Sequence, residues 1–123
     1  MTGRTMPLTV LVVDDALVDR QHLEGILAGA GHRVLIAETG EQGVARARKD
    51  RPDLILMDVN MPDLDGFATT RRLKADAATR DIPVVFVTGK NQKADQAWGR
   101  MLGARGYVGK PYSGAQILEQ VEA

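Results

Sequence analysis

The chain has 123 residues, enough for one domain, and its composition of 44% hydrophobic and 26% charged residues is ordinary for a globular protein. The 16 lysines and arginines balance the 16 aspartates and glutamates, so no excess positive charge attracts nucleic acid and we expect no such partner. Without cysteines, a secretory signal or an apolar run long enough for a membrane span, the sequence favours a cytoplasmic location.

Strand-like and helical segments alternate along the chain. The expected strands are residues 8–13, 34–37, 54–57, 82–87 and 107–108, and the expected helices are residues 17–30, 41–50, 65–75, 94–102 and 113–123. This alternation predicts an α/β protein with a flavodoxin-like, doubly wound parallel sheet. Five βα units give the strand order 2-1-3-4-5 in a three-layer sandwich. We expect an extension at residues 1–7 and one domain at residues 8–123.

Two side-chain patterns within these elements predict burial or exposure. In the fourth helix, five residues repeat with the spacing of an apolar face that packs on the core: Ala94, Ala97, Trp98, Met101 and Leu102. A partner-facing role for Trp98 is the alternative. His22 and His32 are expected on the surface. Neither has a second nitrogen, sulfur or carboxylate ligand at a spacing that suggests a zinc site.

Two of the predicted strands end in aspartates. Residues 8–13 run into Asp14 and Asp15, and residues 54–57 run into Asp58. The carboxyl ends of parallel strands share one edge, where open α/β sheets bind ligands, so we expect the three carboxylates to meet there. Clustered carboxylates repel one another, and a divalent cation would relieve the repulsion.

Two further polar residues stand at strand ends, Thr88 after the fourth strand and Lys110 after the fifth. A carboxylate can attack phosphorus, and a metal ion with a lysine can neutralise the transferred oxygens. A threonine can donate a hydrogen bond to one of those oxygens. Together these side chains predict a site that accepts a phosphoryl group on an aspartate.

The same residues, with Pro111 after Lys110 and a Met-Pro-x-x-x-Gly turn at residues 61–66, resemble the CheY-like receiver domains of response regulators over nearly the whole chain. The resemblance implies that Asp58 is the phosphoacceptor and that Lys110 contacts the phosphoryl group. The switch residues would be Thr88 and Tyr107, and the Lys110–Pro111 peptide would be cis.

The resemblance also implies a metal site. Mg²⁺, for which Mn²⁺ could substitute, would be held by two ligand types, carboxylates and one backbone carbonyl: Asp14, Asp15, Asp58 and the carbonyl of Asn60.

A narrower likeness covers residues 87–99 and 103–111, which are similar to the stand-alone, PilH-type receivers of the type IV pilus chemosensory system that regulate twitching motility. Gly89 and Lys90 differ from the residues that many receivers have at these positions near the site. The sequence therefore does not predict the lifetime of the phosphoryl group on Asp58.

The implied protein is a monomeric, single-domain response regulator. A histidine kinase or its phosphotransfer domain would phosphorylate it, and an effector would bind the face formed by the fourth helix, fifth strand and last helix. Its only catalysis would be phosphotransfer to itself and autodephosphorylation. Three alternatives stay open: a phosphate sink for a shared kinase, an adaptor that is never phosphorylated, and a haloacid-dehalogenase-like phosphatase. The phosphatase would require a second carboxylate where Asn60 stands.

Overall fold

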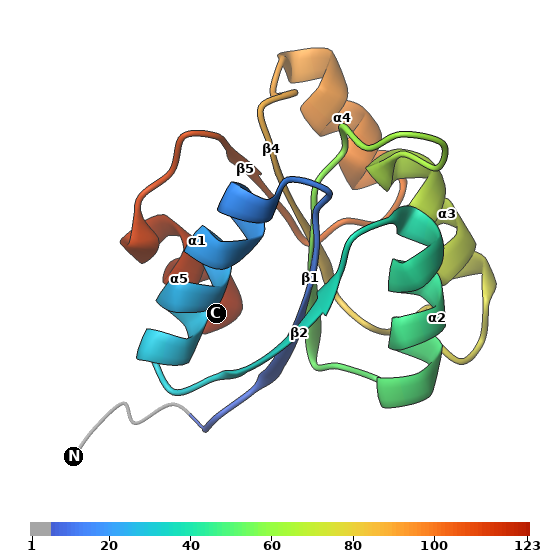
Figure 1. Cartoon of the computed structure of the whole chain (residues 1–123). Helices are drawn as coiled ribbons and strands as arrows, with labels where there is room; N and C mark the ends of the chain where they lie inside the picture. Colours follow the sequence, from blue (N-terminus) through green and yellow to red (C-terminus); the bar gives the residue numbers. More distant parts are fainter. Residues whose placement is uncertain (1–5) are drawn as a thin grey trace.

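The computed structural model describes residues 6–123 and places a parallel five-stranded sheet between two layers of helices (Figure 1). The strands are β1 (Thr9–Val13), β2 (Arg33–Ala37), β3 (Leu54–Met57), β4 (Val84–Thr88) and β5 (Gly106–Gly109). The helices are α1 (Leu17–Gly29), α2 (Gly40–Asp50), α3 (Gly66–Ala75), α4 (Lys93–Met101) and α5 (Gly114–Val121). The sheet order is β2-β1-β3-β4-β5, which confirms the predicted fold. Residues 1–5 of the predicted extension lie outside the described residues.

The side chains of β1 show why the strand runs are continuously apolar. Leu11 and Val13 contact the core on the α2 and α3 side of the sheet, whereas Val10 and Val12 contact the core on the α1 and α5 side. Successive residues of a strand point to opposite faces, so a strand covered on both faces needs an apolar residue at every position. β3 and β4 alternate between the two cores in the same way.

Local signals set the helix ends. Thr39 and Asp65 cap α2 and α3, because each side chain accepts a hydrogen bond from a backbone N–H in the first turn. Ser113 and Gln116 form a capping box at the start of α5. Gly31, which follows α1, has φ +89°, a backbone conformation that glycine adopts without steric cost.

The predicted packing of the α4 apolar face is wrong. Trp98 is 37% exposed and Met101 is 77% exposed, whereas the buried residue of the helix is Gly99. A Cβ at Gly99 would lie 3.1 Å from the rings of Phe86 and Tyr107, so α4 packs on the sheet through its glycine. The larger side chains of the helix therefore turn outward.

The predicted surface position of His32 is also wrong, because its side chain is buried. Nδ1 accepts a hydrogen bond from the Leu8 N–H at 3.1 Å, and Nε2 lies 3.0 Å from Oε2 of Glu122. These contacts join the start of β1 to the end of α5. His22 is exposed, as predicted, and its ring stacks on Tyr112 with the centroids 5.3 Å apart.

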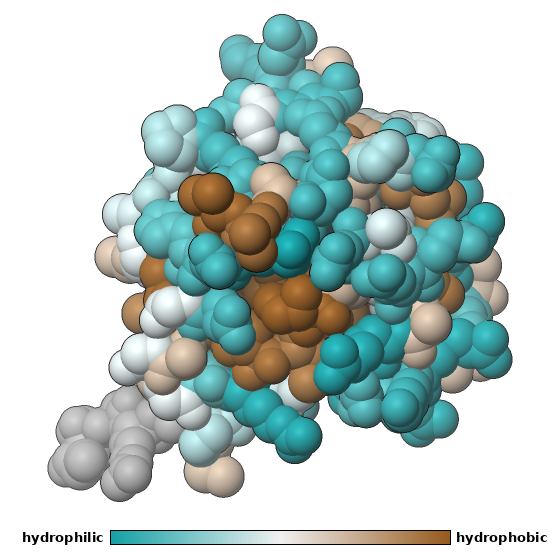
Figure 2. Space-filling view, viewed as in Figure 1, coloured by the Kyte–Doolittle hydropathy of each residue, from teal (hydrophilic) through white to brown (hydrophobic). Residues whose placement is uncertain are grey.

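The surface is mostly hydrophilic on the face that Figure 2 shows, with a hydrophobic area over the edge strand β2, between α1 and α2. Val34 and Ile36 of this strand are half-buried. Within residues 6–123, no helix is both long enough and apolar enough to cross a membrane.

Candidate functional site

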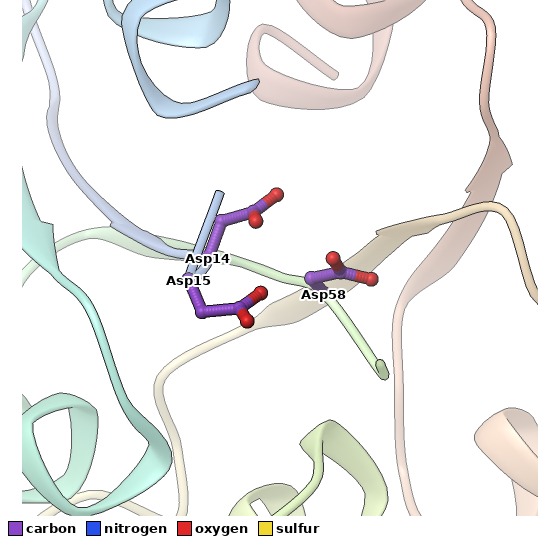
Figure 3. A group of neighbouring side chains, drawn as sticks. All are labelled: Asp14, Asp15 and Asp58. Carbon is purple, nitrogen blue, oxygen red and sulfur yellow. The ribbon is translucent and has the colours of Figure 1, made fainter. Parts of the chain in front are cut away.

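Three aspartates meet at the carboxyl edge of the sheet. Asp14 and Asp15 follow β1, Asp58 follows β3, and one carboxylate oxygen from each lies within 4.8 Å of the others (Figure 3). Asp14 is 1% exposed and Asp58 is 7% exposed, while Asp15 faces solvent. The convergence predicted from the strand ends is therefore present in the structure.

Backbone and side-chain contacts fix the segment after β1. The Asp14 N–H donates to the carbonyl of Ala37, and Oδ1 of Asp14 accepts from the Ala16 N–H at 2.9 Å. Arg20, which is 9% exposed, donates from Nη1 to the Asp14 carbonyl at 2.9 Å. Sequence reasoning missed this arginine, whose only signal is its place one turn into the helix that follows the aspartates.

The turn after β3 requires a glycine. A Cβ at Gly66 would lie 2.1 Å from the carbonyl oxygen of Asp58, closer than any real contact. The Gly66 N–H donates to the carbonyl of Val59, and Oδ1 of Asp58 accepts from the Asn60 N–H at 3.2 Å. The Met-Pro-x-x-x-Gly pattern thus lets α3 begin directly against the segment that carries Asp58.

Lys110 supplies the positive charge of the site. Its Nζ lies 2.9 Å from Oδ2 of Asp14, 2.9 Å from Oδ2 of Asp19 and 3.3 Å from Oδ2 of Asp58. Burial by itself would lower the pKa of Lys110, but the hydrogen bonds to Asp14 and Asp19 and the charge of Asp58 together hold that pKa above its ordinary value. The lysine therefore stays charged among the carboxylates.

Burial also acts on Asp14. It raises the pKa of the Asp14 carboxyl above its ordinary value, against the hydrogen bonds from Ala16 and Lys110, which lower it. The nearby charge of Asp58 raises it further. A second cation at this site would favour the ionised form of Asp14.

Asp19 is a further contact of Lys110 that sequence reasoning missed. It lies in the first turn of α1, and its side chain is 39% exposed. An acidic residue one turn beyond Asp15 was the only signal available for it. Asp19 and Lys110 are 91 residues apart in the sequence, so no local pattern predicts their contact.

Thr88 and Tyr107 lie on the neighbouring strands β4 and β5 and both contact Lys90. The buried Oγ1 of Thr88 accepts from the Lys90 N–H at 3.1 Å, and the Tyr107 hydroxyl donates to the Lys90 carbonyl. The Tyr107 ring packs against Phe86 with the centroids 5.5 Å apart. Burial, followed by the charges of Asp95 and Asp58, raises the pKa of Tyr107 to about 12.

The segment that follows β5 lines a cavity beside the site. The Lys110–Pro111 peptide is cis, as expected. A cavity of about 310 Å³ opens between α1 and this segment, lined by Asp19, His22, Lys110, Pro111 and Tyr112. Lys110 therefore lines this cavity and also contacts two carboxylates of the cluster, Asp14 and Asp58.

The donor set fits a hard divalent cation. Mg²⁺ and Mn²⁺ bind oxygen ligands, and the cluster presents carboxylate oxygens from Asp14, Asp15 and Asp58. Asn60 follows Asp58 by two residues, and its N–H already contacts the Asp58 carboxylate. The exposed Asp15 gives the cluster access to solvent.

Comparison with known proteins identifies the family. The family model of the response regulator receiver domain matches residues 10–122. The chain belongs to the response-regulator receiver family. This receiver domain is 46% identical over 114 residues to protein PilH of Pseudomonas aeruginosa, a match that covers 93% of this chain and 94% of PilH.

Solved structures agree with this family. The receiver domain superposes on the Vibrio cholerae chemotaxis protein CheY4 with a TM-score of 0.88 and 30% identity, covering 94% of this chain and 97% of CheY4. It also superposes on the receiver domain of the sensor histidine kinase PA1611 from Pseudomonas aeruginosa PAO1, with a TM-score of 0.86, 30% identity and coverage of 94% and 95%. That structure has a magnesium ion coordinated in its active site cleft. The resemblance drawn from the sequence is confirmed, and the receiver domain is a component of two-component signalling.

Proposed function

We propose that this receiver domain is a single-domain response regulator that accepts a phosphoryl group on Asp58 in a magnesium-dependent reaction. The observation that carries the proposal is the setting of Asp58, whose carboxylate is nearly buried beside Asp14 and Asp15 with Lys110 at 3.3 Å. Membership of the receiver family supports a histidine kinase, or its phosphotransfer domain, as the donor.

In the proposed reaction, an oxygen of the Asp58 carboxylate attacks the phosphorus atom of a phosphohistidine. The oxygen–phosphorus bond forms, the bond from phosphorus to the imidazole nitrogen breaks, and the electron pair stays on that nitrogen. Lys110 binds the phosphoryl oxygens and offsets their charge. Magnesium, or manganese in its place, held by Asp14, Asp15, Asp58 and the Asn60 carbonyl, would supply further positive charge to the transferred oxygens.

The same residues would later direct water to the phosphorus of the acyl phosphate, where the bond to the Asp58 oxygen breaks and inorganic phosphate leaves. In this proposal the protein acts only on its own phosphoryl group. A haloacid-dehalogenase-like phosphatase needs a second carboxylate as acid and base two residues after the nucleophile. Here that position is Asn60, whose amide cannot fill the role. The residues therefore favour a phosphoacceptor over a turnover enzyme.

The proposed switch runs through Lys90. Thr88 accepts a hydrogen bond from the Lys90 N–H and keeps its own hydroxyl proton free for a phosphoryl oxygen. Phosphorylation adds about −1.5 to −2 charge and would draw Thr88 toward Asp58. That movement would weaken the Lys90 contacts, including the one from Tyr107, and leave space that the Tyr107 ring can enter.

We place the effector on the face formed by α4, β5 and α5. Exposed apolar side chains support this choice, because Trp98 and Met101 project from α4 without packing on the core. The guanidinium of Arg71 lies 5.7 Å from the Trp98 ring centroid and keeps a charge at the border of this face. Trp98→Ala is therefore expected to weaken effector binding without altering phosphorylation.

The cellular role we propose is regulation of type IV pilus twitching motility by a monomeric, cytoplasmic protein. The 46% identity to PilH over nearly the whole of both chains supports this role. The likeness of residues 87–99, which include Trp98, to PilH-type receivers supports it as well. A phosphate sink for a shared kinase is the second candidate, because a receiver that accepts phosphoryl groups from a kinase drains them from it even when it binds no effector. Equal effector affinity before and after phosphorylation would favour the sink.

The proposed function is tested by incubating the protein with acetyl phosphate and Mg²⁺ and measuring its intact mass. We expect one phosphoryl adduct in the parent protein and none in Asp58→Asn. Asp63→Asn is the matched control, because it makes the same change in the same loop outside the carboxylate cluster and should keep the adduct. An adduct that survives in Asp58→Asn would defeat the proposal.

A further inference from the structure

Lys110 is held by a carboxylate that lies outside the proposed metal site. Of its three carboxylate partners, Asp14 and Asp58 belong to the cluster that would bind magnesium, whereas Asp19 does not. The Nζ–Oδ2 distance to Asp19 is 2.9 Å, equal to the distance to Asp14 and shorter than the 3.3 Å to Asp58. The ammonium group would therefore share two of its three partners with a bound metal ion.

This sharing sets two cations in competition. Oδ1 of Asp14 already accepts from the Ala16 N–H, and Oδ1 of Asp58 accepts from the Asn60 N–H, so Lys110 occupies the second oxygen of each carboxylate. An ion that binds Asp14 and Asp58 weakens the attraction that keeps Lys110 there and also repels its charge. A third carboxylate that is not a ligand of the ion would still attract Lys110. Its negative charge would also offset part of the repulsion between Lys110 and the ion.

Asp19 has the position for this task. It comes from the first turn of α1, which Arg20 ties to the segment after β1 through the Asp14 carbonyl. With 39% of its side chain exposed, Asp19 is partly solvated while its Oδ2 lies 2.9 Å from Nζ of Lys110. Its contact with Lys110 lies in the wall of the cavity between α1 and Pro111.

We propose that Asp19 is a positioning residue that keeps Lys110 in the site while magnesium binds, by remaining paired with the ammonium group when the ion takes Asp14 and Asp58. The proposal rests on the magnesium-dependent function above and deepens it, because Asp19 itself binds neither the ion nor the phosphoryl group. It makes magnesium affinity depend on a residue outside the ligand set.

The test measures Mg²⁺ affinity of the unphosphorylated protein by isothermal titration calorimetry. Asp19→Asn is expected to weaken Mg²⁺ binding by roughly two- to fivefold, the upper part of the range for a partly exposed charge pair. Asp19→Glu restores the carboxylate and should recover most of the affinity. Glu24→Gln is the matched control, since it removes a charge from the exposed side of the same helix and should leave the affinity unchanged.

A second background separates action through Lys110 from action on the ion. In Lys110→Met, the further change Asp19→Asn should alter Mg²⁺ affinity by less than about twofold, because the partner of Asp19 is gone. Lys110→Gln serves the same purpose if the methionine variant does not fold, and Asp19→Ser replaces Asp19→Asn on the same condition, with folding checked by circular dichroism.

The outcomes separate this inference from the proposed function. If the parent protein binds no Mg²⁺, the proposed function itself fails. If the parent binds Mg²⁺ and Asp19→Asn binds it equally well, only the role of Asp19 is overturned. Equal weakening in both backgrounds would overturn it too, because Asp19 would then act on the ion directly.

Discussion

Burial controls the ionisation of both tyrosines near the site. It raises the pKa of Tyr107 to about 12 and the pKa of Tyr112 to about 12. The folded protein should therefore show little phenolate absorbance at pH 10, where an exposed tyrosine is about half ionised. A spectrophotometric titration checks this, and the same titration in urea should return both groups to about 10. Identical curves for the folded and unfolded protein would contradict the expected burial.

The same shift has a consequence for stability. At a pH between about 10 and 12, the unfolded chain loses the two phenol protons while the folded chain keeps them. Deprotonation then favours the unfolded state, so the free energy of unfolding should fall as the pH rises through this range. Tyr107→Phe removes one of the two groups and should make that fall shallower.

His32 holds two ends of the chain through its two ring nitrogens, so we expect His32→Ala to lower the free energy of unfolding by about 2 kcal/mol. The Leu8 N–H would lose its acceptor, and the buried ring would leave a cavity. Urea unfolding followed by circular dichroism measures the change. His22→Ala is the comparison, because that ring is exposed and should change the value by about 0.5 kcal/mol or less. Similar losses in the two variants would argue against the role of His32.

At the scale of the elements, replacing each of two glycines with alanine is expected to change stability in opposite directions. Gly25 lies inside α1, and a Cβ added there would have no atom within 4 Å, so Gly25→Ala should stabilise the protein by about 0.5–1 kcal/mol. Gly66 begins α3 against the Asp58 carbonyl, so Gly66→Ala should destabilise it by about 2 kcal/mol or more. Thermal unfolding compares both with the parent. Equal shifts of the melting temperature, with the same sign in both variants, would contradict the surroundings assigned to Gly25 and Gly66.

Most element boundaries could be predicted because the signals are local. The apolar runs of β1, β3 and β4 and the caps at Thr39, Asp65 and Ser113 depend on residues a few positions apart. The outward face of α4 could not be predicted in this way. Helical periodicity groups Trp98 with Met101, but it does not say that Gly99 is the residue that meets the sheet.

At the scale of the whole molecule, the site draws residues from strand ends that are far apart in the sequence. The aspartates could be predicted because the carboxyl ends of parallel strands meet at one edge. No comparable rule predicts which side chains of helices and loops contact one another. The partners of His32 lie 24 and 90 residues away, and the separation between Asp19 and Lys110 is 91 residues.

The proposed signal also crosses the molecule, from Asp58 through Thr88 and Lys90 to the face that carries Trp98. Moving a two-state population from 1:99 to 99:1 requires about 5.5 kcal/mol of differential stabilisation. One rearranged set of contacts at Lys90 is small beside that requirement. We therefore expect phosphorylation to shift the population in part, with effector binding completing the shift.

The central claim, that Asp58 is the phosphoacceptor, is tested most directly by trapping the acyl phosphate. Borohydride reduces an aspartyl phosphate to homoserine, which tandem mass spectrometry locates in the sequence. After treatment with acetyl phosphate and Mg²⁺, we predict homoserine at position 58 alone, and none when a chelator removes the metal. Homoserine at Asp14 or Asp15, or its absence from position 58 in the presence of Mg²⁺, would contradict the account.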